Sequence, residues 1–260
     1  MNTSSWIHYS FRTVTLLTIG LISTSATPSK EKPTPRVNNK IPESILTPDT
    51  VDTRIGKLNF FDGIPTEETS KLLLDNLDLN RGIDAFLNGM PAANVEAARR
   101  GHAALGQKRS NQVLIFDELM DSNSLFLTGN TDTVYATTFL DLKKDGPIVI
   151  EIPEDSGPGI LIDAYSRYVM NFGPPEPDKG KGGKYLILPP GYDEKDYEGI
   201  VAKEFFIAKS TSWVNWFLLR GFLKDGKPNY SSQIFRKGLK IYPLKKTANP
   251  PKMEFIKASG

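Results

Sequence analysis

Two short segments carry side chains that could bind an oxygen-rich ligand or a hard cation. The candidate ligand-binding residues are Asn130, Asp132, Tyr135, Asp163, Tyr165 and Asn171. Each segment adjoins a short apolar run that is typical of a β-strand, and carboxylates, amides and phenols near strand ends suit such ligands. The Asn-Thr-Asp-Thr sequence of residues 130–133 is also a good turn that can satisfy its own backbone. The sequence therefore predicts either a binding site or a pair of polar turns.

A second acidic group consists of Asp117, Glu118 and Asp121, whose spacing could place carboxylates on one face of a helix. Oxygen ligands of this kind suit calcium or magnesium. The same spacing describes a solvated helix end, which is the interpretation we favour.

The Gly-Lys-Gly-Gly-Lys sequence of residues 180–184 has the composition of a phosphate-binding loop. Such loops place a Ser or Thr after the lysine and lead into a helix. Here the lysine is followed by a strand-like Tyr-Leu-Ile-Leu sequence instead. We therefore predict a flexible surface loop without a phosphate.

His102 is the only histidine after residue 8, and the chain contains no cysteine. A zinc site built from several histidines or from thiolates is therefore not expected, and there is no Gly-x-Ser-x-Gly nucleophile motif. His102 lies on the apolar side of a predicted helix, which favours a packed histidine over a catalytic one. The sequence thus assigns no catalytic residue, no resident metal and no cofactor.

The N-terminus has the pattern of a secretory signal peptide covering residues 1–26. Arg12 precedes an apolar run at residues 14–22, and Thr24 and Ala26 fit the small-residue demand of a signal peptidase. The run is shorter than the roughly 20 residues that a membrane-spanning helix needs. We therefore expect a periplasmic or secreted protein with no membrane span after the signal is removed.

Changes in composition and in apolar pattern divide the rest of the chain into further segments. Residues 27–57 are rich in Pro, Lys, Thr and Asn and are predicted to be a linker. Residues 58–110 are predicted to be helical, with a helix start at Pro65 and Thr66 and a break at Gly89 and Pro91 that would give a helical hairpin or layer.

From residue 111 to 245, short apolar runs alternate with Gly- and Pro-rich turns, which predicts a β-sandwich domain. Residues 246–260 are predicted to be a linker. The expected fold class is therefore mainly β with a helical N-terminal layer, and α+β overall. A hydrophobic share of 39% is ordinary for a folded protein, and a net charge of +2 gives no electrostatic footprint for nucleic acid.

Several motifs of this region form an ordered series. They begin with Gln-Val-Leu-Ile-Phe at 112–116, Glu-Leu-Met-Asp at 118–121 and the Asn-Thr-Asp-Thr-Val-Tyr of residues 130–135, and continue at 140–142, 146–147, 151–153, 182–186, 189–192 and 239–244. The series resembles the domain of unknown function 1254 family from about residue 58 to the end of the chain. This resemblance implies an exported bacterial protein with an immunoglobulin-like β-sandwich and helical elements.

The resemblance also implies that a second, jelly-roll-like domain (domain of unknown function 1214) normally follows. Residues 253–260 resemble the linker into that domain, so the chain is predicted to lack it. Aromatic residues that the missing domain would cover are then expected to be partly exposed, namely Trp213, Trp216, Phe217 and Phe222. The family supplies no established reaction, cofactor or catalytic residue.

The leading functional hypothesis is an exported protein that binds or acts on a small oxygen-rich molecule. One alternative is a structural or assembly module that makes protein–protein contacts, including contacts within a homo-oligomer. Another is a metal-assisted hydrolase in which Asp132 and Asp163 hold a hard cation. Convergence of the candidate residues in one concave site would favour the first or the last of these.

Overall fold

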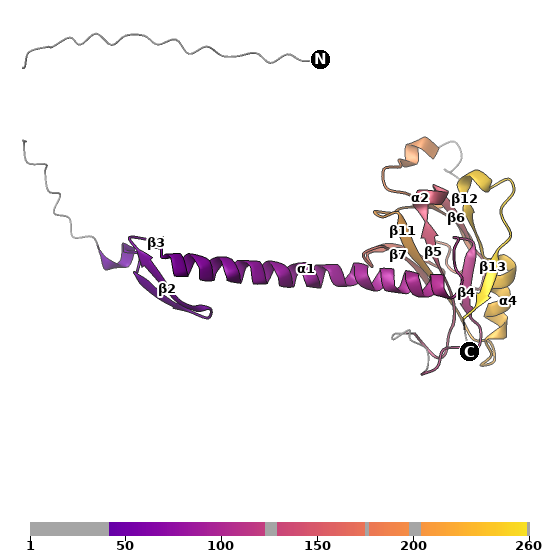
Figure 1. Cartoon of the computed structure of the whole chain (residues 1–260). Helices are drawn as coiled ribbons and strands as arrows, with labels where there is room; N and C mark the ends of the chain where they lie inside the picture. The colour runs from indigo at the N-terminus through magenta and orange to yellow at the C-terminus, as the bar shows by residue number, and fades with distance from the viewer. Residues whose placement is uncertain (1–41, 123–128, 175–176, 198–203, 259–260) are drawn as a thin grey trace, which may run out of the picture. The chain divides into compact units, whose positions relative to one another are not determined.

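The computed structural model describes residues 42–122, 129–174, 177–197 and 204–258 (Figure 1). The chain divides into two compact units, Met1–Thr69 and Ser70–Gly260. The predicted signal peptide, residues 1–26, lies outside the described residues. Within the described ranges, none of the helices combines the length and the apolar character that a membrane crossing requires.

The first unit contains a small antiparallel sheet with the strand order β1-β2-β3. Its elements are η1 (Glu43–Ile45), β1 (Thr50–Thr53), β2 (Gly56–Phe61) and β3 (Ile64–Pro65). The prediction that residues 27–57 form a linker is therefore wrong for residues 50–57, because β1 pairs with β2. The turn between them uses Gly56 at a φ of 128°, a conformation open to glycine, and the sequence signal of this short hairpin was missed.

A single helix, α1 (Glu67–Ala104), replaces the two predicted helices. It begins as predicted, since the Thr66 hydroxyl accepts a hydrogen bond from the Thr69 N–H at 3.2 Å. It does not break at Gly89 or Pro91. Proline removes one N–H, but its fixed φ is compatible with a helix, so α1 continues through Pro91 at the loss of a single backbone hydrogen bond.

The second unit contains a six-stranded sheet with the order β13-β4-β5-β11-β7-β8. Its strands are β4 (Gln112–Phe116), β5 (Val134–Asp141), β7 (Gly159–Asp163), β8 (Tyr168–Phe172), β11 (Val214–Gly221) and β13 (Glu254–Lys257). At its centre, β5 and β11 pair antiparallel over their full eight-residue lengths. The strand β13 pairs parallel with β4, so part of the stretch predicted as a C-terminal linker belongs to this sheet.

The second unit also contains a four-stranded sheet with the order β10-β9-β6-β12. Its strands are β6 (Ile148–Ile152), β9 (Gly183–Leu188), β10 (Phe206–Lys209) and β12 (Lys240–Pro243). The described residues of the unit also include the helices α2 (Leu142–Asp145) and α4 (Asn229–Gly238) and the 3-10 turns η2 (Glu194–Tyr197) and η3 (Leu244–Lys246).

The two larger sheets share one hydrophobic core. Fully buried side chains from both sheets form a single cluster, in which the Phe172 ring of β8 meets the Tyr185 ring of β9 edge-on at 4.7 Å. The predicted class, mainly strands with few helices and α+β overall, is confirmed. The immunoglobulin-like connectivity is not confirmed, and two strand pairs, β4–β13 and β9–β10, are parallel.

The acidic group at 117–121 does not lie on a helix, so that prediction is wrong. These residues follow β4 in a turn, where Asp117 accepts a hydrogen bond from Arg236 at 2.8 Å and Glu118 accepts one from Lys257. Exposed pairs of this kind contribute little to stability. They connect β4 to α4 and β13.

The glycine-rich segment at 180–184 makes a tight turn into β9. Gly182 has a φ of 75°, and a Cβ there would lie 2.5 Å from the Ile152 carbonyl oxygen. The backbones of β6 and β9 therefore approach too closely for any side chain. This close approach accounts for Gly182, so no phosphate-binding role is needed to explain it.

Only part of the aromatic segment around β11 fills the core. Phe217 is buried and Trp216 is half-buried, whereas Trp213 is 42% exposed and Phe222 is 56% exposed. The expectation that some of this aromatic surface faces water is therefore confirmed for the described chain.

His102 anchors the C-terminal end of α1 on the six-stranded sheet. Its ring is buried and meets Phe139 edge-on at 5.0 Å and Trp216 at 6.2 Å. Burial lowers the pKa of His102 from 6.5 to about 4, because an imidazolium ion would lose its solvation there. The prediction of a packed histidine is confirmed.

Acidification should therefore weaken the fold through His102. Between pH 6.5 and pH 4 the unfolded chain binds a proton at this ring and the folded chain does not, so the free energy of unfolding falls as the pH falls. The free energy of unfolding can be measured with urea at pH 7 and at pH 4.5. Between these two pH values it should fall by about 2 kcal/mol less in His102→Phe than in the wild type. Equal losses in the two proteins would contradict a buried neutral His102.

Candidate functional site

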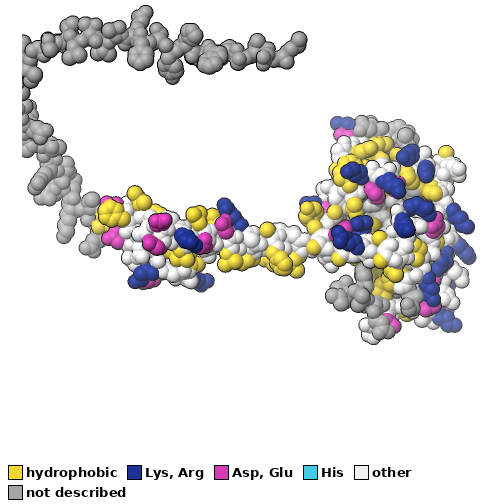
Figure 2. Space-filling model, viewed as in Figure 1, with side chains coloured by type: hydrophobic (Ala, Val, Ile, Leu, Met, Phe, Trp, Pro, Cys, Tyr) yellow, Lys and Arg dark blue, Asp and Glu magenta, His cyan; other side chains and the backbone are white. Residues whose placement is uncertain are grey.

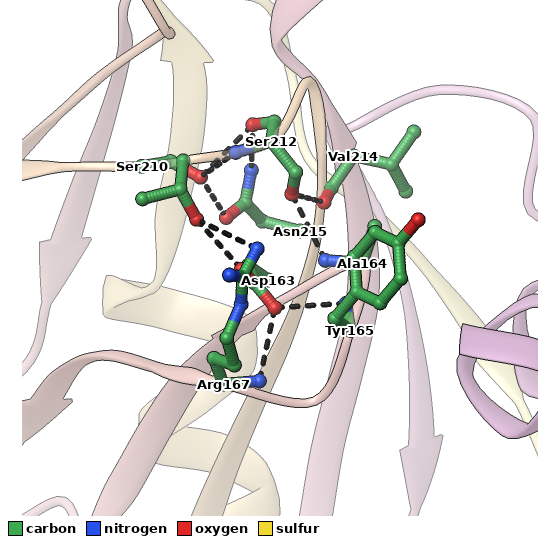
Figure 3. Close-up of polar contacts among 9 residues, drawn as sticks. Asp163, Ala164, Tyr165, Arg167, Ser210, Ser212, Val214 and Asn215 are labelled. Atoms are coloured by element: carbon green, nitrogen blue, oxygen red, sulfur yellow. Dashed lines mark hydrogen bonds and ion pairs between the residues drawn. The ribbon is translucent and has the colours of Figure 1, made fainter. Parts of the chain in front are cut away.

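The carboxylate of Asp163, at the end of β7, is the centre of a polar cluster between two loops (Figure 3). Its side chain is fully buried. Its Oδ1 accepts hydrogen bonds from the backbone N–H groups of Tyr165 at 2.8 Å and Arg167 at 2.9 Å. Its Oδ2 accepts from Nε of Arg167 at 2.8 Å and from the Thr211 hydroxyl at 2.7 Å.

A set of serine and asparagine contacts continues this cluster into the loop before β11. The Ser212 hydroxyl accepts a hydrogen bond from the Ala164 N–H at 2.9 Å and donates one to the Val214 carbonyl at 2.7 Å. The Ser210 hydroxyl donates to Asn215 Oδ1 at 2.6 Å (Figure 3). The segments 163–167 and 210–215 are thus held together by short hydrogen bonds.

These contacts determine the ionisation of Asp163. Burial alone raises the pKa of its carboxyl group, but the hydrogen bonds from Thr211, from the N–H groups of Arg167 and Tyr165 and from the Arg167 guanidinium outweigh burial and hold the pKa below its ordinary value. Asp163 is therefore an anion at neutral pH whose two oxygens each accept two hydrogen bonds. These contacts hold the 163–167 loop against the loop that contains Thr211.

The two predicted segments lie at opposite ends of the six-stranded sheet. Asp163 pairs with Asn215 on β11, whereas Val134, which follows residues 130–133, pairs with Gly221 at the other end of β11. Six residues of extended strand correspond to roughly 20 Å. The structure therefore does not bring Asp132 and Asp163 to one site.

The remaining candidates do not join them. Tyr135 is buried and its hydroxyl accepts a hydrogen bond from the Asn130 N–H at 3.0 Å, while Asp132 is exposed and accepts from the Thr133 hydroxyl at 3.2 Å. This pattern supports a polar turn at 130–135. Asn171 lies on the edge strand β8, opposite Ile160.

Tyr165 is 53% exposed beside Asp163, with the Arg167 guanidinium 5.2 Å from the centroid of its ring. A cation over an aromatic face is weakly stabilising at an exposed site. Tyr165 is thus part of the polar turn that Asp163 organises.

A cavity of about 640 Å³ lies elsewhere, on the outer side of the four-stranded sheet. This volume is in the range of small-molecule pockets. The residues that line it are Lys143, Lys144, Asp145, Gly146, Pro147, Tyr192, Tyr197, Glu204, Phe205, Leu244, Lys245 and Thr247. None of the six predicted ligand-binding residues is among them.

A small apolar cluster on the outward face of the sheet adjoins this cavity, because Tyr197, Phe205 and Leu244 belong to both. Val149 of β6, Leu186 and Leu188 of β9 and Tyr242 of β12 are buried there, with Tyr197 and further half-buried side chains packed against them. Strand alternation sends their neighbours into the main core, so both faces of this sheet are covered. The cavity lies where segments that follow the strands extend over the outward face.

Short local structures position the lysines. The Asp141 carboxylate caps α2 by accepting a hydrogen bond from the Lys144 N–H at 3.0 Å, and Gly146 ends this turn with a φ of 76°. Lys245 lies in η3, directly after β12. The turn before β6 and the turn after β12 lie at the same end of this antiparallel pair, and together they supply the lysines that line the cavity.

The electrostatic balance of the lining favours an anion. The carboxylate of Asp145 accepts a hydrogen bond from the Ser110 hydroxyl at 2.6 Å, and Glu204 lies 3.6 Å from Lys184 Nζ, so both carboxylates interact with groups outside the lining. In the described part of the chain, the ammonium groups of Lys143, Lys144 and Lys245 have no carboxylate partner within salt-bridge distance. Three lysines without a carboxylate partner among the described residues therefore remain beside the cavity.

Two tyrosines give the cavity an aromatic wall. The rings of Tyr192 and Tyr197 are stacked with centroids 6.3 Å apart and an angle of 16° between their planes. Tyr192 is 38% exposed, so its ring remains accessible to a ligand. Sequence analysis missed this site because its residues come from three separate loops, and only the Pro-Pro-Gly-Tyr turn before Tyr192 and the lysines near the C-terminus mark it.

Metal ligation has no structural support in the described residues, which contain no group of three or more His, Cys, Asp or Glu side chains close enough to hold an ion. The composition separately argues against a zinc site built from several histidines or from thiolates. The hard-cation pairing of Asp132 with Asp163 requires a proximity that β11 prevents.

The family model for a protein of unknown function, DUF1254, matches residues 110–243, which is just over half of the chain. The chain belongs to the DUF1254 family. The matched segment covers β4 to β12, which includes the four-stranded sheet, every strand of the six-stranded sheet except β13, the Asp163 cluster and most of the cavity lining.

Among solved structures, the DUF1254 chain is similar to the VPA0106 protein from Vibrio parahaemolyticus, at 18% sequence identity and a TM-score of 0.47. The likeness covers 65% of this chain and 40% of that one, so the chain spans less than half the length of that relative. No curated protein matches the chain.

Replacing Asp163 should weaken the fold without revealing a cation site. We expect Asp163→Asn to lower the free energy of unfolding by about 2 to 3 kcal/mol, because it removes charge-assisted hydrogen bonds to Arg167 and Thr211. The matched change Asp132→Asn should cost less than about 0.5 kcal/mol at its exposed site. Chemical unfolding measures both.

Added calcium or magnesium should leave the melting temperatures of the wild type and of both variants unchanged. A cation-dependent stabilisation of the wild type that either substitution abolishes would contradict this account of the two aspartates.

Proposed function

We propose that this DUF1254 protein is exported and binds a small, oxygen-rich anion, such as a sugar acid, in the cavity on the outer face of the four-stranded sheet. The observation that supports this proposal is a cavity of about 640 Å³ lined by the stacked pair Tyr192 and Tyr197 and by three lysines that have no carboxylate partner among the described residues. Ammonium groups attract the acid, and an aromatic face packs against the C–H groups of a ring.

The chemistry of the lining supports binding more than a specific reaction. The lysines supply donors for carboxylate or phosphate oxygens, and the tyrosine hydroxyls can donate to or accept from a ligand hydroxyl. Phe205, Pro147 and Leu244 provide apolar contacts around these polar groups. A few polar groups within an apolar lining are typical of a site that orients one ligand class.

The metal-assisted hydrolase is the weaker alternative, because its two aspartates lie at opposite ends of β11. The assembly module has separate support in the exposed side chains of α1 and is compatible with ligand binding at the cavity. Export rests on the signal-like pattern of residues 1–26.

Ligand binding can be tested by thermal unfolding and calorimetry with glucuronate and galacturonate, with glucose and galactose as neutral counterparts. A sugar acid at ten times its Kd should stabilise the chain by about 1.4 kcal/mol, and the neutral sugar should bind more weakly. Affinity for the acid should fall with added salt, because the attraction to the lysines is screened.

Two variants locate the site. Lys245→Met removes a charge but keeps the apolar stem, and Tyr192→Leu removes the accessible ring; each should weaken sugar-acid binding at least fivefold. The matched control Lys246→Met changes the neighbouring exposed lysine, which does not line the cavity, and should leave binding unchanged. Equal loss in Lys246→Met, or no binding of any acid to the wild type, would refute the proposal.

Export is tested separately by expression in a bacterial host. Mass spectrometry should find a mature N-terminus at or near Thr27 in the periplasm or the medium, as expected for cleavage after Ala26. An intact Met1 in the cytoplasm of cells with working secretion would contradict export.

A further inference from the structure

One side of α1 carries large apolar side chains that the described chain leaves in water. They are Leu79, Ile83, Phe86, Leu87 and Met90, which are 63%, 46%, 69%, 55% and 52% exposed; we call them the apolar stripe. Figure 2 shows hydrophobic side chains gathered along this helix. Contiguous apolar patches of this kind on a folded protein mark interaction sites.

The stripe has the spacing of a helix-pairing seam. Leu79, Ile83, Phe86 and Met90 follow one another at intervals of four, three and four residues, which is the heptad pattern that keeps one seam facing a partner helix. The pattern continues towards the N-terminus through Asn76, a residue type that specifies register when it lies in such a seam.

The stripe is distinct from the face by which α1 packs on the sheets. The helix residues buried there are Val95 and His102, at 2% and 7% exposure. At 100° per residue they lie roughly 130° around the helix from the stripe. The apolar side chains of the stripe are therefore not an extension of the core.

Two glycines beside the stripe have no explanation within the part of one chain that the structure describes. Gly82 and Gly89 are seven residues apart and so lie on the same side of α1. A Cβ at either position would meet nothing within 4 Å, and neither glycine has a positive φ. Glycine is disfavoured inside a helix, but it permits a close approach by a second helix.

We propose that α1 pairs with α1 of a second copy of this chain in an antiparallel two-helix coil, with the apolar stripe as its seam. A seam of this kind is complementary to itself under two-fold symmetry. In the antiparallel register, Leu79 packs near the partner's Met90 and Ile83 packs near the partner's Phe86.

The charges along α1 support a second copy of the chain as the partner, and they support the antiparallel orientation. The N-terminal half, residues 67–84, has five carboxylates and two cations, whereas residues 85–104 have two arginines and one glutamate. The charged residues are Glu67, Glu68, Lys71, Asp75, Asp78, Arg81, Asp84, Glu96, Arg99 and Arg100. Antiparallel pairing places the acidic half beside the partner's basic half. Parallel pairing would place five carboxylates beside five.

The surface available reaches the lower size limit of a specific interface. The five side chains of the stripe are each about half exposed, and each half-exposed large side chain can bury roughly 100 Å² more. Two copies would therefore bury about 1,000 Å², which is the lower limit for a specific interface. The seam is roughly 39 Å long when it extends over residues 72–97.

Sedimentation and light scattering of the purified chain test the pairing. The wild type should be a dimer at micromolar concentration. The double variant Ile83→Glu with Phe86→Glu should raise the dimer Kd at least 100-fold, and its helix content and thermal unfolding should be retained, because both side chains are exposed in one chain.

The matched control is Leu74→Glu. Leu74 is 60% exposed but lies roughly 150° around the helix from the stripe, so its change should alter the dimer Kd less than threefold. A wild type that stays monomeric at 100 µM, or a control that dissociates as readily as the double variant, would overturn the proposal.

Orientation is tested by oxidation, because the chain contains no cysteine of its own. A mixture of Leu79→Cys and Met90→Cys chains should form disulfide-linked heterodimers, and Leu79→Cys alone should not crosslink. Efficient crosslinking of Leu79→Cys alone would overturn the antiparallel arrangement.

Discussion

The face-to-face packing of the two large sheets is the constraint on which the rest of the structure depends. Inward side chains of β6 and β9, such as Ile150 and Ile187, pack into the same core as Leu161 and Phe217 of the six-stranded sheet. Because alternate residues of a strand point to opposite faces, this packing sends Val149, Leu186 and Leu188 outward. That outward face is also apolar and must be covered, and the cavity arises among the segments that cover it.

A second requirement is that loops at the ends of the sheets be held in place. Asp163 meets it by accepting four hydrogen bonds from two loops, which is why a buried carboxylate is tolerated at the end of β7. Its low pKa shows how thoroughly the neighbouring donors replace water. A perturbed carboxylate can thus be a structural anchor as readily as a functional group.

Local pattern predicted much of this fold, and the misses have physical reasons. Short apolar runs between Gly and Pro turns correctly indicated a strand-rich α+β fold, and the apolar neighbours of His102 indicated a packed ring. Pro91 was overvalued as a helix breaker, because one lost hydrogen bond does not end a long helix. The strand β13 forms by parallel pairing with β4, a contact between residues about 140 apart that no local pattern contains.

The candidate site could be predicted less well than the fold. Polar residues near strand ends were located correctly along the chain, but β11 separates Asp132 from Asp163. Conversely, Lys143, Tyr192 and Lys245 lie far apart in the sequence and none is unusual alone. Only the tertiary arrangement of turns after β5, β9 and β12 places them around one cavity.

The central claim is that this cavity recognises an anion, and nuclear magnetic resonance of labelled protein titrated with a sugar acid tests it most directly. The account predicts saturable shifts of backbone amides confined to residues 143–147, 192–197, 204–205 and 244–247, with residues 130–135 and 163–167 unchanged. Shifts centred on the Asp163 loop or on residues 130–135, with the cavity residues unaffected, would contradict it.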